Sequence, residues 1–190
     1  LVTDKSGNKF GKSEGNALWL DKNKTSSYEL YQYLINLEDS MIIQYLKMLT
    51  FLSPEEIDEL EKSNTEHPEL REAHQALARE IITDLHGTEE YENALRLSKV
   101  LFSGDVANLK AKEIEEVFNG IPRFNIEKDE NLLDFLVNHG IVTSKREGRE
   151  LISTNSISVN GTKITDCDQI ITKDDAIEGK YIIIRRGKKK

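Results

Sequence analysis

Five consecutive residues near the start of the chain combine side chains that suit the binding of phosphate groups: Lys9, Phe10, Gly11, Lys12 and Ser13. A lysine supplies a compact positive charge, a glycine lets the backbone approach a ligand closely, and a serine adds a hydroxyl donor. The segment is not a P-loop, because Gly7 and Gly11 are one residue too close for the pattern G-x-x-x-x-G-K-[ST]. From chemistry alone, a solvated surface loop remains the alternative.

A second group of residues near the end of the chain is basic. Lys145, Arg146 and Arg149 fall on one predicted helix, where 146 and 149 share a face. Together with Lys163 of a predicted hairpin and the basic stretch 185–190, they could form one surface for a phosphate backbone. The alternative is a solvated helix with local Glu–Arg pairs.

Most of the chain that positions these residues has a helical pattern. Apolar residues at three- and four-residue spacing predict helices from Ser27 onward, and Ser53-Pro54 with Glu56 has the pattern of a capping box. We expect Tyr28, Tyr31, Tyr33 and Phe51 to pack in the helical core. The predicted helices of this bundle span 27–34, 42–49, 54 onward, 70–86, 88–102 and 111–118.

The last sixty residues have a different pattern. Turn-forming residues over 121–130 predict a linker, and two short helices are predicted around 132–137 and 144–152. Alternation around Asn160-Gly161 predicts a β-hairpin over 157–164, and 181–184 is predicted as a further strand. The fold class is therefore mainly α, with a helical bundle followed by a small α+β domain.

Composition excludes several classes of protein. No apolar run is long enough to span a bilayer, no signal peptide is evident, and the single cysteine, Cys167, excludes an internal disulfide and a multi-cysteine zinc site. No set of histidines has the spacing of metal ligands. The formal net charge of −8 is unevenly distributed: residues 1–24 carry +2, residues 25–140 carry −14 and residues 141–190 carry +4. Because the chain begins without Met, we expect a piece of a longer cytoplasmic protein.

The motif Lys9–Ser13, followed by Glu14-Gly15-Asn16, resembles the second signature of class I aminoacyl-tRNA synthetases. Its Phe-Gly variant is similar to that of bacterial tyrosyl-tRNA synthetases, and the likeness continues through 19–21, 28–32, 45–52 and 101–105. The last domain resembles the S4-type RNA-binding domain of the same family. The resemblance divides the chain into the end of a catalytic domain (1–24), an anticodon-binding bundle (25–120), a linker (121–130) and an S4-like domain (131–190).

This resemblance implies a function and a set of site residues. Lys9, Lys12 and Ser13 would stabilise the pyrophosphate of ATP while tyrosine attacks the α-phosphorus. Lys145, Arg146, Arg149 and Lys163 would contact RNA. Asp39 near the start of a helix would accept from a guanine edge, although an acid there also complements the helix dipole.

The implied parent protein is a homodimer that uses ATP and Mg²⁺ and binds tRNA(Tyr) through the anticodon and the long variable arm. The present chain is expected to be monomeric, to bind neither ATP nor Mg²⁺ tightly, and to be inactive alone, because the family's nucleotide-binding fold is missing from it. Two alternatives stay open. One is a stand-alone S4-type RNA-binding protein with a helical adaptor, and the other is an acidic helical interaction protein.

Overall fold

The computed structural model describes residues 2–3, 5–13 and 16–187, with backbone alone at 12, 13 and 16. The chain forms two compact units, Leu1–Lys99 and Val100–Lys190, and the boundary between them in the sequence falls inside one helix. The predicted linker at 121–130 lies inside the second unit. The division into four domains, which rests on the family resemblance, stays a prediction.

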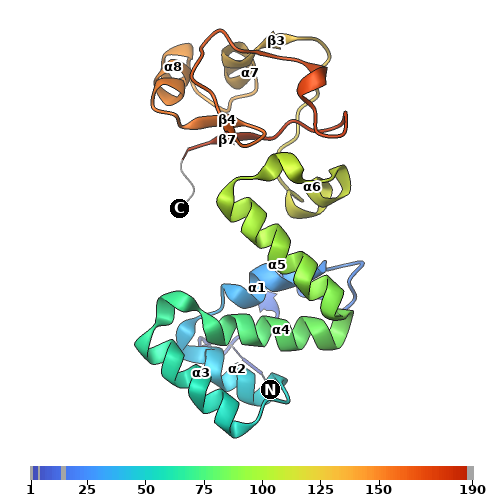
Figure 1. Ribbon diagram of the computed structural model, residues 1–190, viewed down its shortest axis with the longest axis vertical. Coiled ribbons are helices and arrows are strands. Elements are labelled where there is room, and N and C mark those ends of the chain that lie inside the picture. The colour runs from blue at the N-terminus through green and yellow to red at the C-terminus, as the bar shows by residue number, and fades with distance from the viewer. Residues whose placement is uncertain (1, 4, 14–15, 188–190) are drawn as a thin grey trace. The chain divides into compact units, whose positions relative to one another are not determined.

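The first unit is a helical bundle (Figure 1). Its buried core is formed mainly by aliphatic residues, including Leu34, Ile42, Leu46, Leu77 and Ile82, none of which is exposed. These residues recur at helical spacing in the sequence, which is why the pattern predicted helices here. The helices are α1 (Ser27–Ile35), α2 (Asp39–Leu49), α3 (Pro54–Glu66), α4 (Glu72–His86) and the first part of α5 (Thr88–Ser103), with a 3₁₀ turn η1 (Pro68–Leu70) before α4.

The predicted start of α3 is confirmed in detail. The Ser53 hydroxyl accepts from the Glu56 backbone N–H, and the Glu56 carboxylate accepts from the Ser53 N–H at 2.8 Å. These two bonds satisfy N–H groups that have no partner within the helix. The prediction for Phe51 is wrong, however, because its side chain is 96% exposed. It lies in the connection between α2 and α3, outside either helix, so helical spacing does not direct it into the core.

The second unit contains the end of α5 and the predicted α+β domain. Leu132, Leu136, Ile152 and Ile157 are wholly buried between two short helices and a three-stranded antiparallel sheet of order β5-β4-β7. Its elements are η2 (Val106–Asn108), α6 (Ala111–Val117), β3 (Glu130–Asn131), α7 (Leu132–Asn138), α8 (Lys145–Ser153), β4 (Ile157–Val159), β5 (Thr162–Lys163), β6 (Ile170–Ile171), η3 (Lys173–Asp175) and β7 (Ile184–Arg186).

The structure confirms the mainly α fold class and the predicted hairpin. Asn160 and Gly161 at its turn both have positive φ, as a tight turn of this kind requires. The predicted position of the last strand is wrong. It spans Ile184–Arg186 rather than 181–184, because Tyr181 pairs with Ile177 in an isolated bridge.

Candidate functional site

The segment Lys9–Gly11 is held on the helical bundle by aromatic contacts. The Phe10 ring lies 5.5 Å from Tyr33 of α1 and 4.8 Å from Tyr45 of α2, measured between ring centroids. The Gly11 N–H donates to the Tyr33 hydroxyl at 3.1 Å. Lys9, one residue before Phe10, is exposed. The root of the segment is therefore anchored while a lysine side chain is left in solvent.

The backbone continues from this anchor into a short hairpin. Strand β1 (Lys12–Ser13) pairs antiparallel with β2 (Asn16–Ala17), and the Leu18 N–H donates to the Gly11 carbonyl at 2.8 Å. Gly11 has φ +74°, which suits glycine better than other residues. The side chains of Lys12 and Ser13 lie outside the described part of the structure, so their roles stay predictions.

A histidine that sequence reasoning set aside fastens the next segment. Ring nitrogen Nε2 of His86 lies 2.8 Å from the Leu20 carbonyl, and Nδ1 lies 2.8 Å from the Ser27 hydroxyl. That hydroxyl also lies 3.1 Å from Oε2 of Glu90. Both ring nitrogens of His86 thus have a polar partner. His86 joins the end of α4 to the chain that follows the signature hairpin, a role its position before Gly87 did not reveal.

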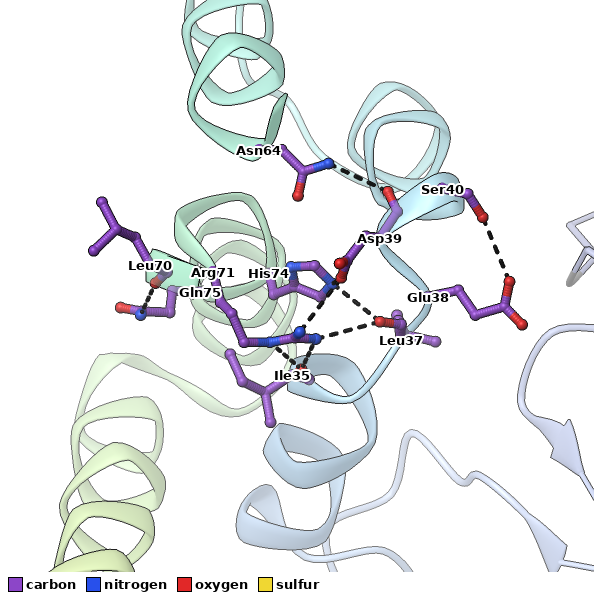
Figure 2. Close-up of polar contacts among 10 residues, drawn as sticks. All are labelled: Ile35, Leu37, Glu38, Asp39, Ser40, Asn64, Leu70, Arg71, His74 and Gln75. Carbon is purple, nitrogen blue, oxygen red and sulfur yellow. Dashed lines mark hydrogen bonds and ion pairs between the residues drawn. The ribbon is translucent and has the colours of Figure 1, made fainter. Parts of the chain in front are cut away.

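Asp39 lies in a polar cluster that joins α2 to α4 (Figure 2). Its Oδ1 is 3.3 Å from Nη1 of Arg71 and 3.2 Å from Nε2 of His74. The carboxylate is half exposed, whereas His74 is wholly buried. Burial, and then the Arg71 charge, lower the pKa of His74, so its imidazole is neutral at pH 7.

Sequence reasoning missed Arg71 because it is a single arginine between two helices, without a pattern. His74 was examined only as a metal ligand. In the structure both act on the backbone as well as on Asp39, through the carbonyls of Ile35 and Leu37. No group of three potential metal-binding residues is found among the described residues.

The three basic residues predicted on α8 differ in their surroundings. Lys145 forms an ion pair with Asp134 of α7, whereas Arg146 and Arg149 are exposed and make no ion pair within the described part of the chain. Gly148 and Ile152, on the other side of the helix, are buried against α7 and the core. The two arginines are therefore free to bind an external anion, and Lys145 would first have to leave Asp134.

Lys163 lies on the sheet rather than on α8. It lies opposite Ser158 of the central strand β4, and Ser158 lies opposite Arg185 of β7 on its other side. The neighbouring residues Ile157 and Ile164 are buried, so this row occupies the outer face of the sheet. Whether this row and the arginines of α8 form the single basic surface expected from the sequence stays a prediction.

Arg186, expected on the same basic surface, has a structural role instead. It donates to the Ile141 carbonyl and lies 2.5 Å from Oε1 of Glu147, tying β7 to the start of α8. Thr143 also donates to Glu147 from its backbone N–H at 2.7 Å and from its hydroxyl at 2.6 Å. These hydrogen bonds, and then the Arg186 charge, lower the pKa of Glu147.

Comparison with known proteins assigns the chain to a class. A family model described as tRNA synthetases class I (W and Y) matches residues 1–103, and one described as tyrosine–tRNA ligase SYY-like C-terminal domain matches residues 113–190. The chain belongs to the class I tRNA synthetase family. No helix among the described residues is long and apolar enough to cross a membrane.

The relatives that resemble the chain are named more narrowly. Tyrosine–tRNA ligase 1 of Bacillus licheniformis is 47% identical, and the tyrosine–tRNA ligase of Geobacillus kaustophilus is 50% identical. Each alignment covers 100% of this chain and 46% of the relative, so the chain spans about half the length of these curated relatives. A C-terminally truncated Aspergillus nidulans mitochondrial tyrosyl-tRNA synthetase matches with 37% identity and a TM-score of 0.44, over 47% of this chain and 25% of that one.

Proposed function

We propose that the chain is the C-terminal half of a tyrosine–tRNA ligase and that its main task is to bind tRNA(Tyr). The observation that carries this proposal is the similarity to named tyrosine–tRNA ligases along all 190 residues. A stand-alone S4-type RNA-binding protein is disfavoured, because the class I synthetase family model matches residues 1–103 as well. The acidic interaction protein is disfavoured for the same reason.

In the proposed protein, the two parts of the chain divide the work. Lys9, Lys12 and Ser13 neutralise charge that develops on the departing pyrophosphate of ATP, by electrostatic stabilisation without a covalent step. The anchoring of Phe10 between Tyr33 and Tyr45 supports this role, because it fixes the root of the loop while Lys9 reaches solvent. ATP with Mg²⁺, tyrosine and a second subunit would engage the catalytic half.

The tRNA would bind to the bundle and to the second unit. Arg146 and Arg149 are available for phosphates of the long variable arm, with Lys163 and Arg185 as a second contact and Lys145 after release from Asp134. Asp39 is proposed to read an anticodon base. Because an RNA helix presents mainly backbone and shape, sequence is read from unpaired bases such as those of the anticodon. A cytoplasmic location accompanies this function.

The experiment that tests the proposal uses the 190-residue chain itself. We expect it to bind a tRNA(Tyr) transcript more tightly than a tRNA with a different anticodon and a short variable arm, measured by filter binding at low and moderate salt. We also expect no tyrosine-dependent pyrophosphate exchange. Exchange by a preparation free of the host synthetase would contradict the assignment of catalysis to the missing half. Equal binding of the two tRNAs would contradict the proposal that tRNA(Tyr) is the specific partner.

A further inference from the structure

Arg71 is fixed by the backbone of the connection between α1 and α2 before it reaches Asp39. Its Nε and Nη2 donate to the Ile35 carbonyl at 3.1 and 2.6 Å, and Nη2 also donates to the Leu37 carbonyl at 3.3 Å. Only Nη1 remains to contact Asp39, at 3.3 Å (Figure 2). A guanidinium is a planar fork, so fixing two of its nitrogens fixes the direction of the third.

His74 holds the same connection from the buried side. Its Nε2 lies 3.0 Å from the Leu37 carbonyl and 3.2 Å from Oδ1 of Asp39. Both partners are acceptors, so Nε2 carries the proton. The other nitrogen, Nδ1, is buried without a hydrogen-bond partner among the described residues, which suits a neutral ring. A neutral donor orients the carboxylate without adding a second positive charge beside it.

Both contacts use the same oxygen of Asp39. Oδ1 is engaged by Arg71 and His74, while Oδ2 makes no hydrogen bond or ion pair within the described part of the chain, and the side chain is 51% exposed. The backbone carbonyl of Asp39 is held as well, by Asn64 at 3.3 Å. The result is a carboxylate with one side fixed and the other presented to solvent as an acceptor.

A fixed acceptor discriminates between bases. The Watson–Crick edge of an unpaired guanine presents two adjacent donors, N1–H and the exocyclic amine, whereas adenine presents an acceptor at N1. A carboxylate free to rotate could turn away from adenine at little cost. If the carboxylate is held in place, its oxygen faces the acceptor N1 of adenine, and the two lone pairs repel each other. The discrimination against adenine therefore depends on the groups that hold the carboxylate.

We propose that Arg71 and His74 are positioning residues that hold the Asp39 carboxylate toward the Watson–Crick edge of a guanine in the tRNA anticodon. This proposal rests on the proposed function, in which the bundle binds tRNA and Asp39 reads a base. It adds that base specificity resides in a three-residue unit, Asp39–Arg71–His74, assembled from α2, the start of α4 and the connections before them.

The test compares guanine preference with overall affinity in the full-length protein. The probes are a tRNA(Tyr) transcript and the same transcript with its anticodon guanine replaced by adenine, and the variants are Asp39→Asn, Arg71→Gln and His74→Leu. We expect each to lower the guanine-over-adenine binding ratio about tenfold, within the range for one good base contact. His74→Gln, which keeps a side-chain N–H, should retain most of the ratio. Arg79→Gln, exposed on the same helix, is the matched control.

The outcomes separate the two proposals. If Asp39→Asn leaves the ratio unchanged, Asp39 is not the base reader and the proposed function loses that contact. If Asp39→Asn lowers the ratio but the Arg71 and His74 variants keep it, the positioning role is overturned. Equal weakening of both transcripts by Arg71→Gln would also overturn it, because that is the signature of a purely structural residue. Should Arg71→Gln fail to fold, Arg71→Lys keeps the charge without the fork and serves in the same comparison.

Discussion

Glu147 is a residue whose charge state ties together the start of α8 and the last strand. Its carboxylate accepts from Thr143 twice and pairs with Arg186, and these contacts lower its pKa. A carboxyl group whose pKa is lowered by folding adds stability above its unfolded pKa, and that stability is lost as pH falls through the folded pKa.

We therefore expect Glu147→Gln to lower the denaturant midpoint of the protein at pH 7. The difference from the parent should shrink as pH falls below the ordinary range of glutamate, because the parent then loses the same charge. Urea titrations at pH 7, 5 and 3, followed by circular dichroism, measure this. Glu150→Gln, exposed on the same helix, changes the net charge equally and should show no such trend. A constant difference at all three pH values would contradict the assignment.

Gly161 is required for two reasons, its backbone conformation and its surroundings. Its φ is +85°, and a Cβ atom there would lie 2.4 Å from the Gly104 carbonyl oxygen, which belongs to backbone and cannot rotate away. Gly179 has a similar φ of +68° but open space around it. Replacing each glycine by alanine therefore distinguishes the free-energy cost of backbone strain, which both share, from the cost of a steric clash, which only Gly161 has.

We expect Gly161→Ala to destabilise the protein more than Gly179→Ala, by about 1–3 kcal/mol, the usual cost of overpacking. Thermal and urea unfolding of both variants provide the comparison. Equal losses would mean that the segment at Gly104 yields freely and that the hairpin turn is not packed against it.

At the level of elements, α8 presents two kinds of basic residue. Lys145 is paired with Asp134, while Arg146 and Arg149 face solvent. Because each phosphate contact contributes about 0.9 to the slope of log K against log salt concentration for duplexes and about 0.7 for single strands, the two kinds should differ in effect.

We expect Arg146→Ala with Arg149→Ala to weaken tRNA binding and to reduce that slope by nearly two. Lys145→Ala should reduce it by less than one, since this lysine already has a partner. Filter binding between 50 and 200 mM salt is the measurement, and Lys173→Ala, an exposed lysine at η3, is the control. An unchanged slope for the arginine pair would show that they do not contact phosphate.

At the scale of the whole molecule, acidic and basic residues are concentrated in different parts of the chain. The acidic stretch 25–140 covers the bundle, and the basic residues gather in the loop before it and in the domain after it. A polyanion such as tRNA would be attracted to the ends of the chain and would approach the bundle only where a specific contact compensates for repulsion. In the proposed function Asp39 lies at such a contact, where a carboxylate suits base reading rather than phosphate binding.

We expect Lys12→Ala in the full-length protein to slow formation of the tyrosyl-adenylate about a hundredfold, the scale of one lost electrostatic contact to a transition state. Affinity for tRNA(Tyr) should stay unchanged, because in the proposed function this lysine acts on ATP. Pyrophosphate exchange and filter binding measure the two effects separately. A fall in tRNA affinity with normal exchange would place the loop at the RNA instead.

Local patterns in the sequence determined much of this protein. The capping box at Ser53, the hairpin at Asn160-Gly161 and the helices of both units depend on neighbouring residues, and the motif at Lys9 carried the family resemblance. These features were predictable because helix and turn formation are governed by interactions over three or four positions.

Tertiary structure alone decided which polar groups meet. Arg71 reaches Asp39 across 32 residues and Arg186 reaches Glu147 across 39, and no periodicity records such pairs. Phe51 was predicted in the core and is exposed, because it lies in the connection between α2 and α3 rather than on a helix. Long-range contacts depend on the path of the whole backbone. The chemical groups could therefore be identified from the sequence, whereas their partners were determined only by the fold.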